Sequence, residues 1–176
     1  MRTLTLKPGG VTWKGWNAVW IWALLGKYPP DEMSFMSETR PRQFVDTNVL
    51  IYAHDISAGE KRIRAKELML DLWQSGEGCL SIQVLQEFYV NVTQKATRPL
   101  PSEAAAQIVA DLSVWEVHRP RTEDVLDAIH IQKRYQISFW DSMILVSALQ
   151  LGCHVLWSED LNPGQVYEKV EVQSPF

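Results

Sequence analysis

The chain has 176 residues, of which 46% are hydrophobic, so it is long enough for one globular domain with a sizeable core. Its formal net charge of -4 excludes the strongly basic surface of a protein that holds nucleic acid by bulk electrostatics, so any such binding must come from a local site. Two cysteines, Cys79 and Cys153, lack the paired spacing of a zinc site, and no secretory cleavage pattern accompanies them, so we expect a cytoplasmic protein.

Residues 1–41 differ in composition from the rest of the chain. Half of the eight tryptophans fall within ten positions there, namely Trp13, Trp16, Trp20 and Trp22. The apolar run inside this segment is about half as long as the ~20 residues that a membrane-spanning helix needs, so we expect no membrane association. We interpret residues 1–41 as a dispensable leader from an over-extended or non-native start, because Met33 and Met36 lie just before the first expected strand. The alternative is an interfacial or partner-binding helix.

From residue 42 onward, short apolar strands alternate with amphipathic helices. Ala65, Leu68, Met69 and Leu72, for example, repeat at the spacing of one helix face. In chain order, the pattern predicts a strand at 43–45, a short helix from Thr47, a helix at 59–74, a strand at 78–82, helices at 81–94 and 100–112, a strand at 114–118, helices at 122–134 and 138–151, a strand at 153–157 and a fifth strand candidate at 169–172. These elements predict one α/β domain over residues 42–176, with a central, mostly parallel sheet of four to five strands flanked by helices.

Two acidic residues fall where predicted strands end. Asp46 follows the strand at 43–45, and Asp160 lies just past the strand at 153–157. Ligands of such sheets bind beyond the carboxyl ends of the strands. We therefore expect both carboxylates to reach one crevice, although they are far apart in the sequence.

Two further acids lie on predicted helices. Glu87 shares a helix face with Gln83, Asn91 and Gln94, opposite the apolar stripe that packs into the core. Asp141 opens the most apolar helix of the chain. Both acids therefore join the set of candidate site residues.

Each of the four acids also has a purely structural interpretation. Asp46 can cap the short helix that follows it, and Asp141 can form a capping box with Ser138. Glu87 can belong to a solvated helix face, and Asp160 can form a turn in SEDLNPG. Taken singly, none of the four residues indicates a site, but the combination does.

Four segments carry a resemblance to a known family: FVDTNVLIYAHD, LSIQVLQEFYVN, SFWDSMILVSAL and VLWSEDLN, which contain Asp46, Glu87, Asp141 and Asp160. Their order and spacing resemble the acidic quartet of PIN-domain nucleases, in particular the VapC-type toxins of prokaryotic toxin–antitoxin pairs. The resemblance covers about residues 42–176 and not the tryptophan-rich leader, which such small toxins normally lack. It implies an endoribonuclease that leaves a 5′-phosphate and a 3′-hydroxyl on its RNA substrate, with a cognate antitoxin as partner and a homodimeric assembly.

The four carboxylates indicate a metal site independently of the family resemblance. At a separation of about 6 Å, each pair repels by roughly 3 kcal/mol at an effective dielectric near 20, so a cation or the protonation of one or two acids must compensate. Hard oxygen ligands favour Mg²⁺ or Mn²⁺, which also bind phosphate oxygens. We interpret Asp46 and Asp141 as direct or water-bridged metal ligands, and Glu87 and Asp160 as completing the shell or orienting the attacking water. The residues expected to support these carboxylates are Thr47, Asn48 and Ser158.

Other functions stay open at this stage. A catalytically inactive PIN-like module could keep the fold and use the crevice only to hold RNA or a partner protein. A signalling receiver also gathers acids around Mg²⁺, but at strand tips, whereas Glu87 and Asp141 lie on predicted helices. The basic segment EKRIRAK, residues 60–66, could steer an RNA backbone, although such a run on an amphipathic helix is more often a solvated face.

Overall fold

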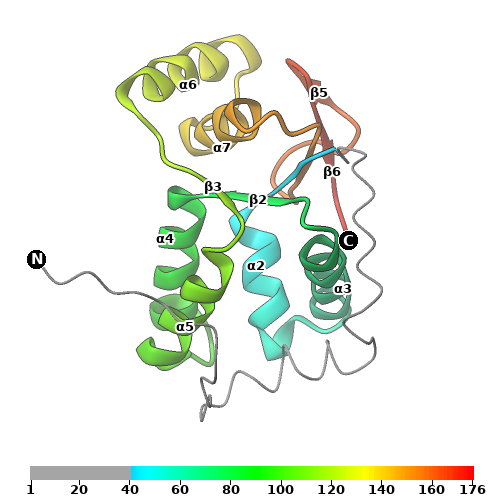
Figure 1. The fold of residues 1–176 in the computed structure, drawn as a ribbon, viewed down its shortest axis with the longest axis vertical. Helices are drawn as coiled ribbons and strands as arrows, with labels where there is room; N and C mark the ends of the chain where they lie inside the picture. The colour runs from blue at the N-terminus through cyan, green and yellow to red at the C-terminus, as the bar shows by residue number, and fades with distance from the viewer. Residues whose placement is uncertain (1–40) are drawn as a thin grey trace, which may run out of the picture. The chain divides into compact units, whose positions relative to one another are not determined.

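A six-stranded sheet forms the centre of the described part of the chain, residues 41–176, in a computed structural model (Figure 1). The predictions about a leader fall almost entirely on residues 1–40 and so lie outside the described residues. The strands are β1 (Gln43–Val45), β2 (Gly78–Ser81), β3 (Glu116–His118), β4 (Val155–Trp157), β5 (Val166–Tyr167) and β6 (Val170–Gln173). Their order across the sheet is β3-β2-β1-β4-β6-β5, and all neighbours pair in parallel except β5 and β6.

Helices cover both faces of the sheet. The helical segments are α2 (Thr47–His54), η2 (Ile56–Ala58), α3 (Glu60–Ser75), α4 (Ile82–Val90), the π-helix η3 (Asn91–Lys95), α5 (Ser102–Leu112), α6 (Thr122–Tyr135) and α7 (Phe139–Gln150). Figure 1 shows α2, α3, α4 and α5 together on one face and α6 and α7 on the other. This division follows from right-handed crossovers, because the chain moves outward from β1 to β3 and then returns past β1 to β4.

Strands β1 and β4 lie side by side at the point where the chain reverses its direction across the sheet. Val45 pairs with Trp157, and the backbone N–H of Asp46 donates to the carbonyl oxygen of Trp157 at 3.0 Å. In open α/β sheets, ligands bind outside the carboxyl ends of the strands at such a switch point. The residues that follow β1 and β4 are therefore brought together at one edge.

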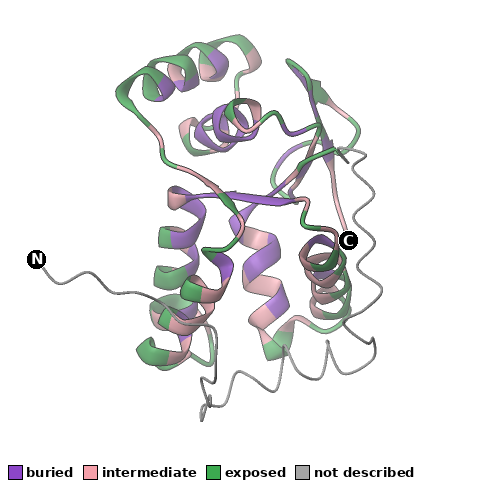
Figure 2. Ribbon diagram, in the orientation of Figure 1, coloured by how far each residue is buried: buried purple, intermediate pink, exposed green. Residues whose placement is uncertain are grey.

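Helix α7 is one of the most deeply buried elements of the domain (Figure 2). Seven consecutive residues, Ser142–Ala148, are buried, as expected for a helix that is apolar on all sides. The hydroxyls of Ser142 and Ser147 donate to backbone carbonyls one turn earlier, so their burial leaves neither hydroxyl without a partner. The first turn of α7 therefore belongs to a firmly packed helix.

The predicted α/β class with a mostly parallel sheet is confirmed, and two details differ from the sequence-based expectation. Strand β5 makes a sixth strand, because a two-residue strand is too short to leave a periodic signal. The helix expected at 81–94 becomes α4 followed by the π-helix η3, in which the wider turn shifts the helix face. Within residues 41–176, no helix is long and apolar enough to cross a membrane.

Candidate active site

A pocket of about 560 Å³ lies at the carboxyl ends of β1 and β4. All four acids singled out from the sequence line it: Asp46, Glu87, Asp141 and Asp160. Asp46 follows β1 and Asp160 follows β4, whereas Glu87 comes from α4 and Asp141 from the first turn of α7. The fold thus gathers carboxylates from four separate segments into one space.

Asp46 is the most enclosed of the four acids, with 4% of its surface exposed. Its side chain caps α2 by accepting a hydrogen bond from the backbone N–H of Thr47, so the structural interpretation of this residue also holds. The second carboxylate oxygen, Oδ2, accepts from Ser158 Oγ at 2.7 Å and from Asn48 Nδ2 at 2.9 Å. Three donors therefore fix the orientation of the carboxylate.

Asn48 and Ser158 also connect Asp46 to Asp160. Asn48 Nδ2 donates to Asp160 Oδ2 at 3.1 Å, in addition to its hydrogen bond with Asp46. Ser158 Oγ accepts from the backbone N–H of Asp160 at 3.1 Å while its own hydrogen goes to Asp46. One amide and one hydroxyl thus each contact both acids and hold them within reach of each other.

The basic segment at 60–66 contributes one contact to the loop that carries Asp160. Lys61 on α3 forms an ion pair with Glu159, and its ammonium nitrogen lies 4.7 Å from the ring centroid of Tyr52. Lys61 is therefore engaged with the protein and does not belong to a freely solvated face.

Glu87 is held by side chains from two different elements. The Thr47 hydroxyl donates to Oε2 at 2.9 Å, and Gln83 Nε2 donates to Oε1 at 2.9 Å. Because Thr47 directly follows Asp46, its hydroxyl links the acid on α4 to the end of β1. Gln83 is itself buried, and its Nε2 also donates to the carbonyl oxygen of Trp140 at 3.4 Å.

Asp141 combines a capping role with its place in the pocket. Ser138 is the N-cap of α7, and its Oγ accepts a hydrogen bond from the backbone N–H of Asp141 at 3.0 Å. The carboxylate of Asp141 lines the pocket at the same time. The structural and functional interpretations of this residue are therefore compatible.

Burial and mutual repulsion raise the pKa values of two of the acids. Burial raises the pKa of Asp46 from 3.8 to about 7, although the hydrogen bond from Ser158 opposes the shift. The charges of Asp160 and Asp141 add to the rise in the pKa of Asp46. Burial likewise raises the pKa of Asp141, and the charges of Asp160 and Glu87 contribute to it. Such coupling is expected of carboxylates that share one site.

The residues of the pocket fit a hydrated divalent cation. Within residues 41–176, no three His, Cys, Asp or Glu side chains converge closely enough to hold a metal ion by themselves. Mg²⁺ needs no such cage, because it keeps several waters and binds through one or two carboxylates together with substrate phosphates. Two buried amide oxygens of pocket residues, Asn48 Oδ1 and Gln83 Oε1, have no hydrogen-bond partner in the described part of the chain and can accept from metal-bound waters.

Several residues that line the pocket are absent from the set predicted from sequence, and Lys95 and Trp140 are two of them. Regular helical spacing places Gln94 on the face of Glu87, but the π-helix η3 shifts that face and brings Lys95 to the pocket instead. Trp140 directly precedes Asp141, and this adjacency is the signal that could have indicated it.

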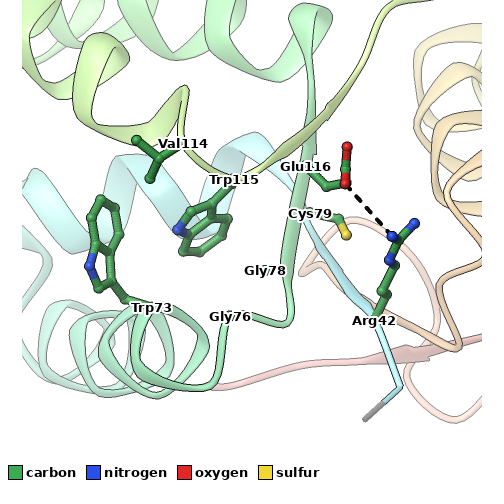
Figure 3. Close-up of a pocket in the computed structure, with 8 residues that line it drawn as sticks. All are labelled: Arg42, Trp73, Gly76, Gly78, Cys79, Val114, Trp115 and Glu116. Carbon is green, nitrogen blue, oxygen red and sulfur yellow. Dashed lines mark ion pairs between the residues drawn. The ribbon is translucent and has the colours of Figure 1, made fainter. Parts of the chain in front are cut away.

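A second, smaller hollow lies at the opposite edge of the sheet (Figure 3). It measures about 260 Å³ and is lined by residues near the amino ends of β1, β2 and β3, including Arg42, Gly78 and Glu116. Trp73 and Trp115 also line it, with ring centroids 6.0 Å apart. None of the four acids lines this hollow, so the candidate site is confined to the carboxyl edge.

The fold and the acidic pocket define the class of protein as a PIN domain. The family model described as PIN domain matches residues 44–169, and the chain belongs to this family. The match confirms the family predicted from the four sequence segments and supports the prediction of a nuclease. No curated protein matches the sequence significantly.

Solved structures of similar fold come from toxin–antitoxin systems. A toxin–antitoxin complex from Klebsiella pneumoniae shares 19% identity at a TM-score of 0.57, over 76% of this chain and 98% of that chain. DNA-bound VapBC from Salmonella typhimurium shares 18% identity at a TM-score of 0.54, over 78% of this chain and 100% of that chain. VapC20 of Mycobacterium tuberculosis, a toxin that cleaves the sarcin-ricin loop, shares 19% identity at a TM-score of 0.52, over 67% of this chain and 89% of that chain. At these identities, the similarity shows the shared fold.

Proposed function

We propose that this protein is a divalent-metal-dependent endoribonuclease and the toxin of a toxin–antitoxin pair. The observation that carries the proposal is the pocket at the carboxyl ends of β1 and β4, which is lined by Asp46, Glu87, Asp141 and Asp160. A structural role explains each acid singly, but it does not explain why all four line one pocket in which their charges repel. Membership of the PIN family supports a nuclease at this position.

In the proposed reaction, Asp46 and Asp141 would hold Mg²⁺ or Mn²⁺ directly or through water. Glu87 and Asp160 would complete the shell or orient the water that attacks the phosphate. When bound, the ion supplies an activated water and offsets the charge that develops on the phosphate oxygens. The four acids together provide the hard oxygen ligands that such ions prefer.

Three neutral side chains support the carboxylates in this proposal. Thr47 donates a hydrogen bond to Glu87, and Asn48 and Ser158 both donate to Asp46. Neutral donors orient a carboxylate without cancelling its charge, so that the charge stays available to a cation.

The products follow from the attacking group. Because water attacks and not the 2′-hydroxyl of the RNA, cleavage should leave 5′-phosphate and 3′-hydroxyl ends. The test incubates labelled single-stranded RNA with the purified protein in Mg²⁺, Mn²⁺ or EDTA and maps the product ends. Cleavage that persists in EDTA, or cyclic phosphate ends, would contradict the proposal. A folded protein that binds RNA but cleaves none with either metal would instead be a catalytically inactive binding module.

The proposed partner is a cognate antitoxin. Its basic side chain would enter the acidic pocket and replace the metal, since charge complementarity favours such an encounter. Expression of this chain alone should arrest growth, and co-expression of the neighbouring gene should relieve the arrest. Normal growth in cells that contain active protein would count against a toxin. A homodimer and a cytoplasmic location stay predictions, and light scattering of the purified protein tests the first.

A further inference from the structure

Trp140 is a large aromatic side chain that is exposed beside the acidic pocket. Its exposed fraction is 62%, although it lines the pocket and immediately precedes Asp141. An exposed indole ring forgoes the stabilisation that burial of its apolar surface would give. The residues that follow in α7, from Ser142 to Ala148, are buried. The exposure of Trp140 is therefore not shared by this part of the helix.

One ring contact and one backbone hydrogen bond locate Trp140 relative to its neighbours. Phe139 packs against the indole edge to face, with ring centroids 5.4 Å apart and an interplanar angle of 68°. Gln83 Nε2 donates to the carbonyl oxygen of Trp140 at 3.4 Å and to Glu87 Oε1 at 2.9 Å. One buried side chain therefore links the position of Trp140 to that of Glu87.

Lys95 adds a positive charge to the same pocket. Among the described residues, it is the one cationic side chain that lines the pocket, and it forms no ion pair within residues 41–176. Sites for single-stranded nucleic acid combine these two features, because bases stack on aromatic rings and phosphates contact cations. A base inside an RNA duplex is already stacked and paired, and it has no free face for Trp140.

We propose that Trp140 stacks on an unpaired base next to the scissile phosphate. The inference rests on the proposed function and adds to it a residue that binds the substrate. Stacking of this kind is present in the bound substrate and in the transition state alike. Its loss should therefore raise KM and leave kcat nearly unchanged.

The primary test measures the affinity of the full chain for a labelled single-stranded RNA in EDTA, where metal-dependent cleavage does not occur. Trp140→Ala should weaken binding by at least about fivefold, which is the lower end of the loss found when a stacked base loses its aromatic partner. Trp140→Phe keeps a ring and should retain most of the affinity. Leu126→Ala on α6 is the matched control, because Leu126 is 55% exposed but does not line the pocket.

A second measurement locates the stacked base. A single abasic site is moved along the RNA, and at one position the wild type and Trp140→Ala should bind equally well. Annealing a complementary strand should remove the difference between the two proteins as well. If Trp140→Ala does not fold, Trp140→Leu keeps an apolar side chain without a ring and serves the same comparison.

The outcomes separate this inference from the nuclease proposal. A folded Trp140→Ala protein that binds single-stranded RNA as tightly as the wild type overturns the inference. A variant that keeps RNA binding but loses binding to the antitoxin also overturns it and assigns the ring to a protein partner. Failure of the nuclease proposal appears separately, as wild-type protein that binds RNA through Trp140 but cleaves none in Mg²⁺ or Mn²⁺.

Discussion

Replacing Asp46 by Asn should stabilise the metal-free protein at pH values above 7. Burial raises the pKa of Asp46 from 3.8 to about 7, so between these values the folded state holds a proton that the unfolded state releases. The contribution of the Asp46 carboxyl to the free energy of unfolding is therefore fully present below pH 3.8. It is lost as the pH rises through about 7. Asn carries no charge, so the variant avoids this loss.

The expected size of the effect follows from the hydrogen bonds of Asp46. A shift of this size corresponds to about 4 kcal/mol at ~1.36 kcal/mol per pKa unit. Asn can still cap α2, but its amide group replaces an oxygen that accepts from both Ser158 and Asn48. Both of these hydrogen bonds lose their acceptor, at a cost of about 1 kcal/mol each. The variant should therefore be more stable than the wild type by roughly 2 kcal/mol at pH 8 and less stable than the wild type near pH 4.

Urea unfolding in EDTA over this pH range measures the difference. Asp71→Asn, on the exposed side of α3, controls for the general loss of one negative charge. The wild type and Asp71→Asn should lose stability in parallel as the pH rises, whereas the stability of Asp46→Asn should depend less on pH. If all three proteins show the same dependence on pH, Asp46 does not hold a raised pKa and the electrostatic argument for the site is wrong.

Three further substitutions test separate parts of the account. Ser138→Ala removes the N-cap of α7 and a hydrogen bond that lowers the pKa of Asp141. We therefore expect a loss of roughly 1 kcal/mol in urea unfolding and a cleavage pH profile shifted to higher pH, and an unshifted profile would argue against Asp141 as a metal ligand. Lys95→Ala should weaken binding of single-stranded RNA and reduce the slope of log affinity against log salt by roughly 0.7, and an unchanged slope would exclude a phosphate contact. Gly78→Ala places a Cβ against the ring of Trp115 and should cost about 1–3 kcal/mol of stability, while the cleavage rate per folded molecule should not change because Gly78 lies at the opposite edge of the sheet.

The strand ends were predictable from the sequence because their signals are local. Asp46 and Asp160 each follow a short apolar strand, and the general rule for parallel sheets is enough to expect them at one edge. Asp141 and Ser138 have the spacing of a helix start, which the hydrogen bond between Asp141 N and Ser138 Oγ reproduces. The α/β class follows from the same alternation of short strands and helices.

The contacts between segments were not predictable, because nothing local specifies them. The hydrogen bond from Thr47 to Glu87 joins the end of β1 to α4, and neither residue carries a sequence signal for the other. Lys95 reaches the pocket through a π-helix, which a regular helical period does not predict. Trp140 is one apolar residue among many in its segment, and apart from its place next to Asp141 only its exposure in the folded protein distinguishes it.

The most direct test of the metal-dependent nuclease measures Mn²⁺ binding by calorimetry and RNA cleavage in the same preparations of wild type and Asp46→Asn. The wild type should bind Mn²⁺ and cleave single-stranded RNA only when the metal is present. Asp46→Asn should fold, keep its helix cap and neither bind the metal with comparable affinity nor cleave. A folded Asp46→Asn protein that cleaves RNA at a rate close to that of the wild type would contradict the assignment of this pocket as the active site.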